Sequence, residues 1–213
     1  MRTIETKVYT FEELTPEAKQ KAIENYKDTY HDDFYTEYVY EDAAILADIM
    51  GLDICQTLKT RSDKSTHYAP TIYYSGFWSQ GDGACFEGEY RYKPGALKAL
   101  KAHAPQDKEL HRICKVLQDA QRVNFYKVSA TIKHRGYYYH AGCMDIELSH
   151  DDDRYRDIKN EDDFIQAFRD FADWIHSQIE SAYEYENSDE QITETLIANE
   201  YEFTFEGGML SRN

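Results

Sequence analysis

The chain has 213 residues and a formal net charge of −16, from 40 acidic and 24 basic side chains. Its 41% hydrophobic and 15% aromatic content excludes an intrinsically disordered protein. No apolar run approaches the ~18 residues of a membrane-spanning helix, and the first residues lack the apolar core of a secretory signal. We therefore expect a cytoplasmic protein with no membrane partner.

The charge is distributed in three blocks along the chain. Residues 1–58 hold 13 acids and 5 bases, which gives −8, whereas residues 59–144 hold 7 acids and 14 bases, which gives +7. Residues 145–206 hold 20 acids and 4 bases, which gives −16. Blocks of one sign act at a distance and select partners of the opposite sign. The pattern favours a binding protein, and its acidic C-terminal block favours a basic partner.

The first elements, over residues 15–50, are predicted to be helices. Thr15-Pro16-Glu17 is a typical helix start, with a capping threonine, proline at the first helical position and an acid in the first turn. A second helix is predicted over residues 35–50. Gly51 follows at the position where glycine commonly ends a helix.

Residues 52–148 are predicted to form the core of a sheet. We expect a short strand over 52–58, a polar loop over 59–69, and two hairpins with two helices between them. The first hairpin joins 71–78 to 84–92 around Ser79–Gly83, and the second turns at Arg135-Gly136. The intervening helices are expected over 94–103 and 107–124.

The C-terminal part, residues 160–200, is predicted to be helical and acidic. Its longest helix opens at Asn160 or Glu161 and runs to about Glu186, because Phe and Ile recur along one narrow arc. A shorter helix is expected over 189–199. The predicted fold class is α+β, with an antiparallel sheet of four or five strands, helices packed on one face, and a long acidic amphipathic C-terminal helix. We expect residues 1–213 to form a single domain.

Two segments carry a family resemblance. They are Tyr9-Thr10-Phe11-Glu12-Glu13-Leu14-Thr15-Pro16-Glu17-Ala18-Lys19 and Tyr74-Ser75-Gly76-Phe77-Trp78-Ser79-Gln80-Gly81-Asp82-Gly83-Ala84-Cys85-Phe86-Glu87-Gly88. With residues 109–122 and the C-terminal helix, they make the chain resemble a family encoded by bacteriophages and prophages. Its members are often named "antitoxin of toxin–antitoxin stability system". The resemblance implies an accessory protein that acts in the cytoplasm of a bacterial host.

The acids opposite the apolar arc of the long helix are the predicted partner-binding surface, together with the acidic turn before it. These acids are Asp151, Asp152, Asp153, Asp162, Asp163, Asp170, Asp173, Glu180 and Glu184. From Asp162 to Glu184 the helix spans ~33 Å at 1.5 Å per residue. B-DNA carries about 19 charges over that length, so the six helix acids supply about a third of them. Mimicry of nucleic acid is therefore partial unless neighbouring segments or a homodimer add charge.

We expect a non-enzymatic inhibitor that binds a basic host protein of defence or nucleic-acid handling through this surface. One alternative is an antitoxin that neutralises a cognate basic toxin. Another is that the acidic arc is only a solvated helix face. No cofactor or metal is expected, because no CxxC or CxH pair occurs and the 150–157 segment has Arg156 where an EF-hand loop needs glycine.

The basic central block, residues 59–144, offers a second candidate, a nucleic-acid or nucleotide site. This is the less favoured hypothesis. Its ligand-binding residues would be Trp78, Gln80, Asp82, Lys133, Arg135 and Tyr138. A plain hairpin turn explains Gly81-Asp82-Gly83 equally well, and Trp78 is expected in the core because Trp is buried on average. The four cysteines are expected to be free, mostly buried thiols. A catalytic set of Cys85, His140 and Asp82 is disfavoured because nothing in the sequence brings the three together.

Overall fold

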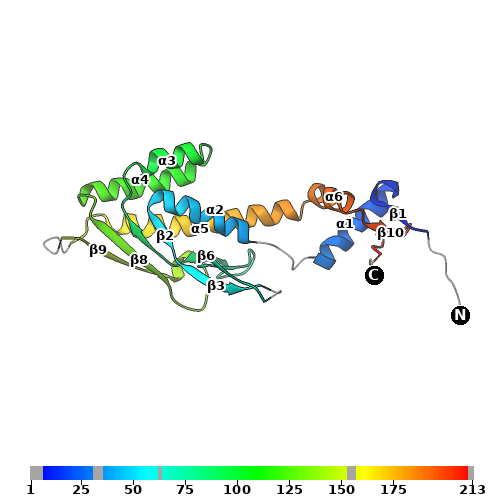
Figure 1. The fold of residues 1–213 in the computed structure, drawn as a ribbon, viewed down its shortest axis with the longest axis horizontal. Coiled ribbons are helices and arrows are strands. Elements are labelled where there is room, and N and C mark those ends of the chain that lie inside the picture. Colours follow the sequence, from blue (N-terminus) through cyan, green and yellow to red (C-terminus); the bar gives the residue numbers. More distant parts are fainter. Residues whose placement is uncertain (1–6, 31–35, 62–63, 153–156, 211–213) are drawn as a thin grey trace. The chain divides into compact units, whose positions relative to one another are not determined.

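The computed structural model describes residues 7–30, 36–61, 64–152 and 157–210. The chain, expected to be one domain, divides into two compact units (Figure 1). Unit 1 comprises Met1–Tyr35 and Ser181–Asn213, and unit 2 comprises Thr36–Glu180. The predicted N-terminal helical part, 15–50, is split between them, because its first helix contacts the C-terminal helix Asp189–Ala198 (α6) whereas its second contacts the sheet.

Unit 2 is built on a four-stranded antiparallel sheet with the strand order β2-β7-β8-β9. The strands are Leu52–Ile54 (β2), Gly88–Arg91 (β7), Val128–His134 (β8) and Met144–His150 (β9). Side chains alternate in and out, as the pleat requires. Leu52, Tyr90 and Ile132 are buried, whereas Asp53 and Glu89 are exposed on the opposite face. The predicted antiparallel sheet is confirmed.

Helices cover the apolar face of this sheet (Figure 1). They are Glu37–Met50 (α2), Lys108–Val123 (α4) and Glu161–Glu186 (α5, whose residues from Ser181 belong to unit 1). The short helix Ala96–His103 (α3) contacts α2 and α4. The ring of Tyr90 on β7 lies 5.2 Å from that of Phe168 on α5. Gly51 ends α2 with φ 90°, as predicted. The predicted α+β class and the long C-terminal helix are thereby confirmed.

Two further hairpins extend unit 2. Strands Ile72–Ser75 (β5) and Gly83–Phe86 (β6) pair as predicted, around the turn that contains Asp82. Strands Gln56–Thr60 (β3) and Thr66–Pro70 (β4) also pair. The predicted polar loop over 59–69 is therefore wrong. Most side chains of this hairpin are exposed and polar. The segment therefore lacks the alternation of apolar and polar residues by which a half-buried strand is recognised in a sequence.

Unit 1 has a small core of its own. Its elements are Tyr9–Thr10 (β1), Phe11–Glu13 (η1), Pro16–Tyr30 (α1), Asp189–Ala198 (α6) and Glu202–Phe203 (β10). Strand β1 pairs with β10, and Phe11, Ala22, Leu196 and Phe203 pack together. Helix α1 begins at Pro16 as predicted, with the Thr15 hydroxyl accepting a hydrogen bond from the Ala18 N–H. In the described parts of both units, no helix has the length and apolar character needed to cross a bilayer.

Candidate functional site

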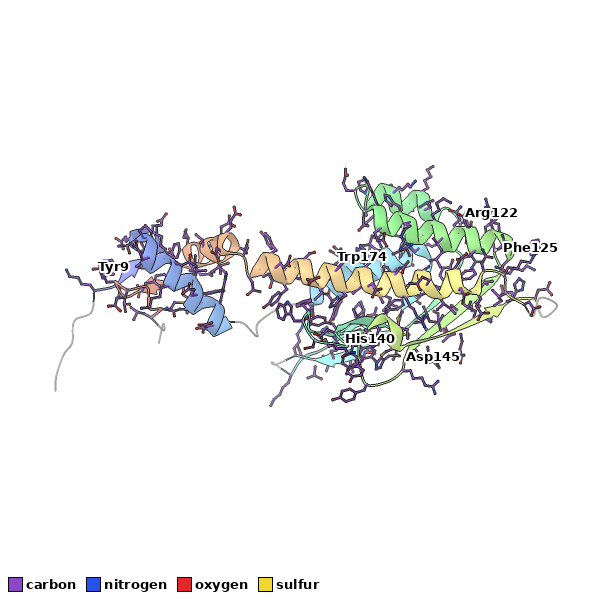
Figure 2. The ribbon with its side chains drawn as sticks, turned by 180° about the vertical axis from the view of Figure 1, so that it is seen from behind. Tyr9, Arg122, Phe125, His140, Asp145 and Trp174 are labelled. Carbon is purple, nitrogen blue, oxygen red and sulfur yellow. The ribbon has the colours of Figure 1, made fainter. Side chains whose placement is uncertain are left out.

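A groove of about 570 Å³ lies between the N-terminal end of α4 and the middle of α5. One wall is formed by residues 106–109. The other is formed by residues of α5, namely Asp170, Asp173, Trp174, Ser177 and Gln178. Figure 2 labels Trp174 on this helix. The volume falls within the ~300–1,000 Å³ of ligand pockets, so the groove can admit a long side chain or a small molecule.

Asp107 and Trp174 join the two walls. Asp107 is the N-cap of α4, where its Oδ1 accepts a hydrogen bond from the Leu110 N–H at 2.9 Å. Its Oδ2 accepts a second one, at 2.8 Å, from the indole Nε1 of Trp174. The indole ring also stacks on Phe171 with an interplanar angle of 6°. One carboxylate therefore both starts α4 and fixes the orientation of the tryptophan.

Arg112 of α4 binds two carboxylates beside the groove. It donates to Glu109 through Nε and Nη2, and its Nη2 also donates to Oδ2 of Asp170 at 2.5 Å. The hydrogen bonds from Arg112 lower the pKa of Glu109. Asp170 also accepts a hydrogen bond from Gln166 and has only 17% of its side chain exposed. Its charge is thus largely compensated within the chain.

Of the four acids that line the groove, Asp173 is the one for which the described part of the chain supplies no direct partner. Among the described residues it forms no hydrogen bond or ion pair. Asp173 is an exposed residue, yet partial desolvation of its carboxyl raises the pKa, the nearby Asp170 carboxylate raises it further, and His176 and His140 oppose the shift. Because the pKa is raised in the folded state, ionisation of Asp173 costs stability. Its contribution is most favourable at acid pH and is lost as the pH rises through the folded-state value. A cation in the groove would relieve that cost.

The other predicted partner-binding acids lie outside the groove. Asp162 and Asp163 are exposed in the first turn of α5, where they suit the helix dipole. The remaining ones are Asp151 (exposed), Asp152 (ion-paired with Lys127 at 4.0 Å), Glu180 (half-buried), Glu184 (exposed, in unit 1) and Asp153, which lies outside the described residues. Of the predicted partner-binding acids, the groove holds Asp170 and Asp173.

The alternative ligand-binding residues, apart from Lys133 near the end of β8, lie on two loops that meet. A Cβ added to Gly81 would approach the Tyr138 ring to 2.7 Å, so the β5–β6 turn packs against the loop after β8. Trp78 is 76% exposed, which overturns the expectation that it lies in the core. Gln80 and Lys133 are also exposed. Arg135 donates to Asp145 at 3.3 Å, which reduces the net positive charge of this surface.

The hairpin Gly81-Asp82-Gly83 has a structural explanation. The Asp82 carboxylate accepts hydrogen bonds from the backbone N–H groups of Trp78 and Ser79, at 3.0 and 2.7 Å. Asp82 therefore closes the turn and is not available as part of a catalytic set. Cys85 is fully buried, and burial raises the pKa of its thiol to about 12. A Cys85, His140 and Asp82 centre is accordingly not supported.

Residues 35–189 match the family described as "Domain of unknown function (DUF8835)". The chain belongs to this family. The matched range includes the whole of unit 2, and therefore the sheet, the groove and both loops of the DUF8835 domain.

A separate similarity covers 61 residues, 43% of which are identical to D-lysergyl-peptide-synthetase subunit 1 of Claviceps purpurea. The same similarity is found with the subunit from Claviceps purpurea strain 20.1. The match covers 29% of this chain but only 2% of the synthetase subunit. No solved structure matches the chain significantly.

Several residues of the DUF8835 domain were missed by sequence reasoning. Trp174 lines the groove and Arg112 lies beside it. Trp174 bonds to Asp107, 67 residues away, and Arg112 bonds to Asp170, 58 residues away, so neither contact follows from a local pattern. The helix predicted over 107–124 begins at Asp107, and this position indicates the capping role of Asp107. It gives no indication of the hydrogen bond from the Trp174 indole, because Trp174 is distant in the sequence. Within the described residues, no group of three or more His, Cys, Asp or Glu is arranged to hold a metal ion.

Proposed function

We propose that this protein is a non-enzymatic binding protein that accepts a basic segment of a partner protein in the groove between α4 and α5. The observation that supports this most directly is Asp173, an exposed carboxylate that lines a groove of about 570 Å³ and has no direct partner among the described residues. An arginine or lysine side chain has the length and charge to fill such a space. A planar guanidinium also suits a wall of carboxylates and an indole ring.

The composition of the groove supports a cationic ligand. Four of its lining residues are acidic (Asp107, Glu109, Asp170 and Asp173), and Lys108 is the basic one. Arg112 lies beside them and already binds Glu109 and Asp170, so this part of the molecule contains one bound guanidinium of its own. The net charge of −16 would speed the encounter with a basic partner.

The partner we propose is a basic bacterial protein whose activity is blocked on binding. The resemblance to phage-encoded proteins supports a host protein of defence or nucleic-acid handling, in the bacterial cytoplasm. A cognate basic toxin is the second candidate and would use the same groove. Broad mimicry of nucleic acid is less favoured, since Asp170 is paired internally and the other acids are spread over both units.

Capture experiments with matched charge reversals test the proposal. Immobilised wild-type protein, Asp173→Lys and Asp162→Lys are incubated with bacterial lysate, and the retained proteins are identified by mass spectrometry at low and raised salt. Both variants change the charge equally, but Asp162 lies outside the groove. We expect basic proteins that wild type and Asp162→Lys retain and that Asp173→Lys loses, with retention weakened by salt.

Circular dichroism of both variants establishes that they are folded, and Asp173→Asn provides a milder second variant. If the same proteins are retained by all forms, the groove is not the binding site. If Asp162→Lys and Asp173→Lys lose them equally, a diffuse acidic surface is responsible and the proposed groove is wrong.

A further inference from the structure

Strand β9 forms one edge of the four-stranded sheet (Figure 1). Within the described residues, β8 is the strand that pairs with it, and its other side has no strand neighbour. With seven residues, β9 is longer than β2, the three-residue strand at the opposite edge. An edge strand presents backbone N–H and C=O groups that another chain can pair with. The long edge of this sheet is therefore suited to the addition of a strand.

Two hydrogen bonds at the ends of the β8–β9 ladder show which backbone groups of β9 point outward. The Arg135 N–H donates to the Cys143 carbonyl at 2.7 Å, and the Asp151 N–H donates to the Lys127 carbonyl at 3.0 Å. Hydrogen-bonded pairs alternate along an antiparallel ladder, so the odd-numbered residues of β9 bond to β8. The N–H and C=O groups of its even-numbered residues therefore point away from the sheet.

The apolar face of β9 is incompletely covered. Ile146 lies opposite Ile132 of β8, and Leu148 lies opposite Ala130. Ile132 and Ala130 are buried, whereas Ile146 and Leu148 are only half-buried. Because residues that face each other on neighbouring strands point to the same side of a sheet, an added strand would place its own side chains beside Ile146 and Leu148. Apolar side chains at these positions would remove the remaining apolar surface from water.

The opposite face of β9 is acidic and exposed. Asp145, labelled in Figure 2, forms an ion pair with Arg135 at 3.3 Å. Glu147 lies opposite Thr131 and has no ion-pair partner among the described residues. On an added antiparallel strand, the residue opposite Glu147 would belong to a pair without backbone hydrogen bonds, in which side chains approach most closely. A lysine or arginine at that position complements the Glu147 carboxylate.

Pairing between two copies of β9 is less favourable than pairing with a basic segment. In the symmetric antiparallel arrangement centred on Glu147, the Glu147 side chains of the two copies lie opposite each other. Moving the centre to Ile146 places Asp145 of each copy opposite Glu147 of the other. Like charges directly opposite each other destabilise a sheet, and the net charge of −16 on each copy adds repulsion.

We propose that β9 is the docking edge for an extended segment of a partner protein in which basic residues alternate with apolar ones. The segment adds a strand to the sheet, and its backbone bonds to the outward N–H and C=O groups of β9. Its apolar side chains cover Ile146 and Leu148, and its basic side chains lie beside Glu147 and Asp145. The residues of β9 do not line the groove between α4 and α5, so this inference does not depend on the groove.

Amide hydrogen exchange, followed for each residue by ¹⁵N NMR, tests the edge with a synthetic peptide. The peptide has the length of β9 and alternates lysine with valine. A control peptide of the same composition has all its lysines at one end. We expect the alternating peptide, at about ten times its Kd, to slow the exchange of the Ile146 and Leu148 N–H groups about tenfold. The control peptide should leave both rates unchanged, because it cannot present a basic and an apolar face.

Glu147→Lys is expected to weaken binding of the alternating peptide about tenfold, because it replaces a cross-strand attraction by a repulsion. Glu89→Lys is the matched control. It makes the same change of charge at an exposed acid of β7, which lies in the interior of the sheet. Circular dichroism of both variants verifies the fold before the affinities are compared.

The proposal is overturned if the control peptide slows exchange equally, or if Glu89→Lys weakens binding as much as Glu147→Lys. Exchange at Ile146 and Leu148 that slows with protein concentration in the absence of peptide would also overturn it, since a second copy would then occupy the edge. The protection should persist in Asp173→Lys. Its loss there would assign the peptide to the groove and contradict docking at β9.

Discussion

Replacing Gly51 by alanine is expected to destabilise unit 2 strongly. Gly51 has φ 90°, and a Cβ there would lie 2.2 Å from the carbonyl oxygen of Arg91. The left-handed conformation costs an L-residue about 1–2 kcal/mol. Because the obstacle is backbone, relief requires displacement of β7 and adds about 1–3 kcal/mol, as in other overpacked sites. Denaturant unfolding followed by tryptophan fluorescence measures the loss.

Gly95→Ala is the matched control, because Gly95 has φ 80° but a Cβ there would meet nothing within 4 Å. Its cost should be confined to about 1–2 kcal/mol for the backbone conformation. The protein has two tryptophans, Trp78 and Trp174, and both belong to unit 2, so their fluorescence reports on that unit. Equal losses for the two variants would contradict the close approach of Gly51 to Arg91.

Phe168→Ala is expected to have the second large effect, a loss of about 3–5 kcal/mol in the free energy of unfolding. The Phe168 side chain is 1% exposed and its ring meets that of Tyr90 edge-on. Truncation leaves a cavity between α5 and the sheet. The measurement is denaturant unfolding, with Ile45→Ala as the control.

Ile45 lies on α2 in the same unit and is 50% exposed. Its replacement should change the free energy of unfolding by no more than about 0.5 kcal/mol. If Phe168→Ala were as mild as Ile45→Ala, the packing of α5 on the sheet would be wrong.

Local signals in the sequence were sufficient to predict the secondary elements around the groove. The bounds of α5 followed from the recurrence of Phe and Ile along one arc. Pro16 marked the start of α1 and Gly51 the end of α2, because the backbone preferences of these residues act within a few positions. The β3–β4 hairpin was missed because both strands are largely exposed and carry no apolar alternation. The division into two units was missed because it depends on which distant helices pack together.

The candidate site itself was only partly predictable. Asp170 and Asp173 belonged to the predicted acidic face, but their different roles depend on Arg112, which lies 58 residues from Asp170. The sequence treats the two acids alike, whereas the structure pairs one and leaves the other without a direct partner among the described residues. Likewise, nothing in the sequence placed a cysteine beside His140, whereas the turn at residues 141–143 brings Cys143 there.

The central claim is that a basic side chain enters the groove beside Trp174. It is tested most directly by ¹⁵N NMR of the two indole N–H groups during titration with a short arginine-rich peptide. Trp174 lines the groove and Trp78 does not, so each spectrum contains its own control. We predict that the Trp174 signal shifts saturably while that of Trp78 stays in place, and that Asp173→Lys abolishes the shift. A Trp174 signal that does not move, or that moves equally in Asp173→Lys, would contradict the account.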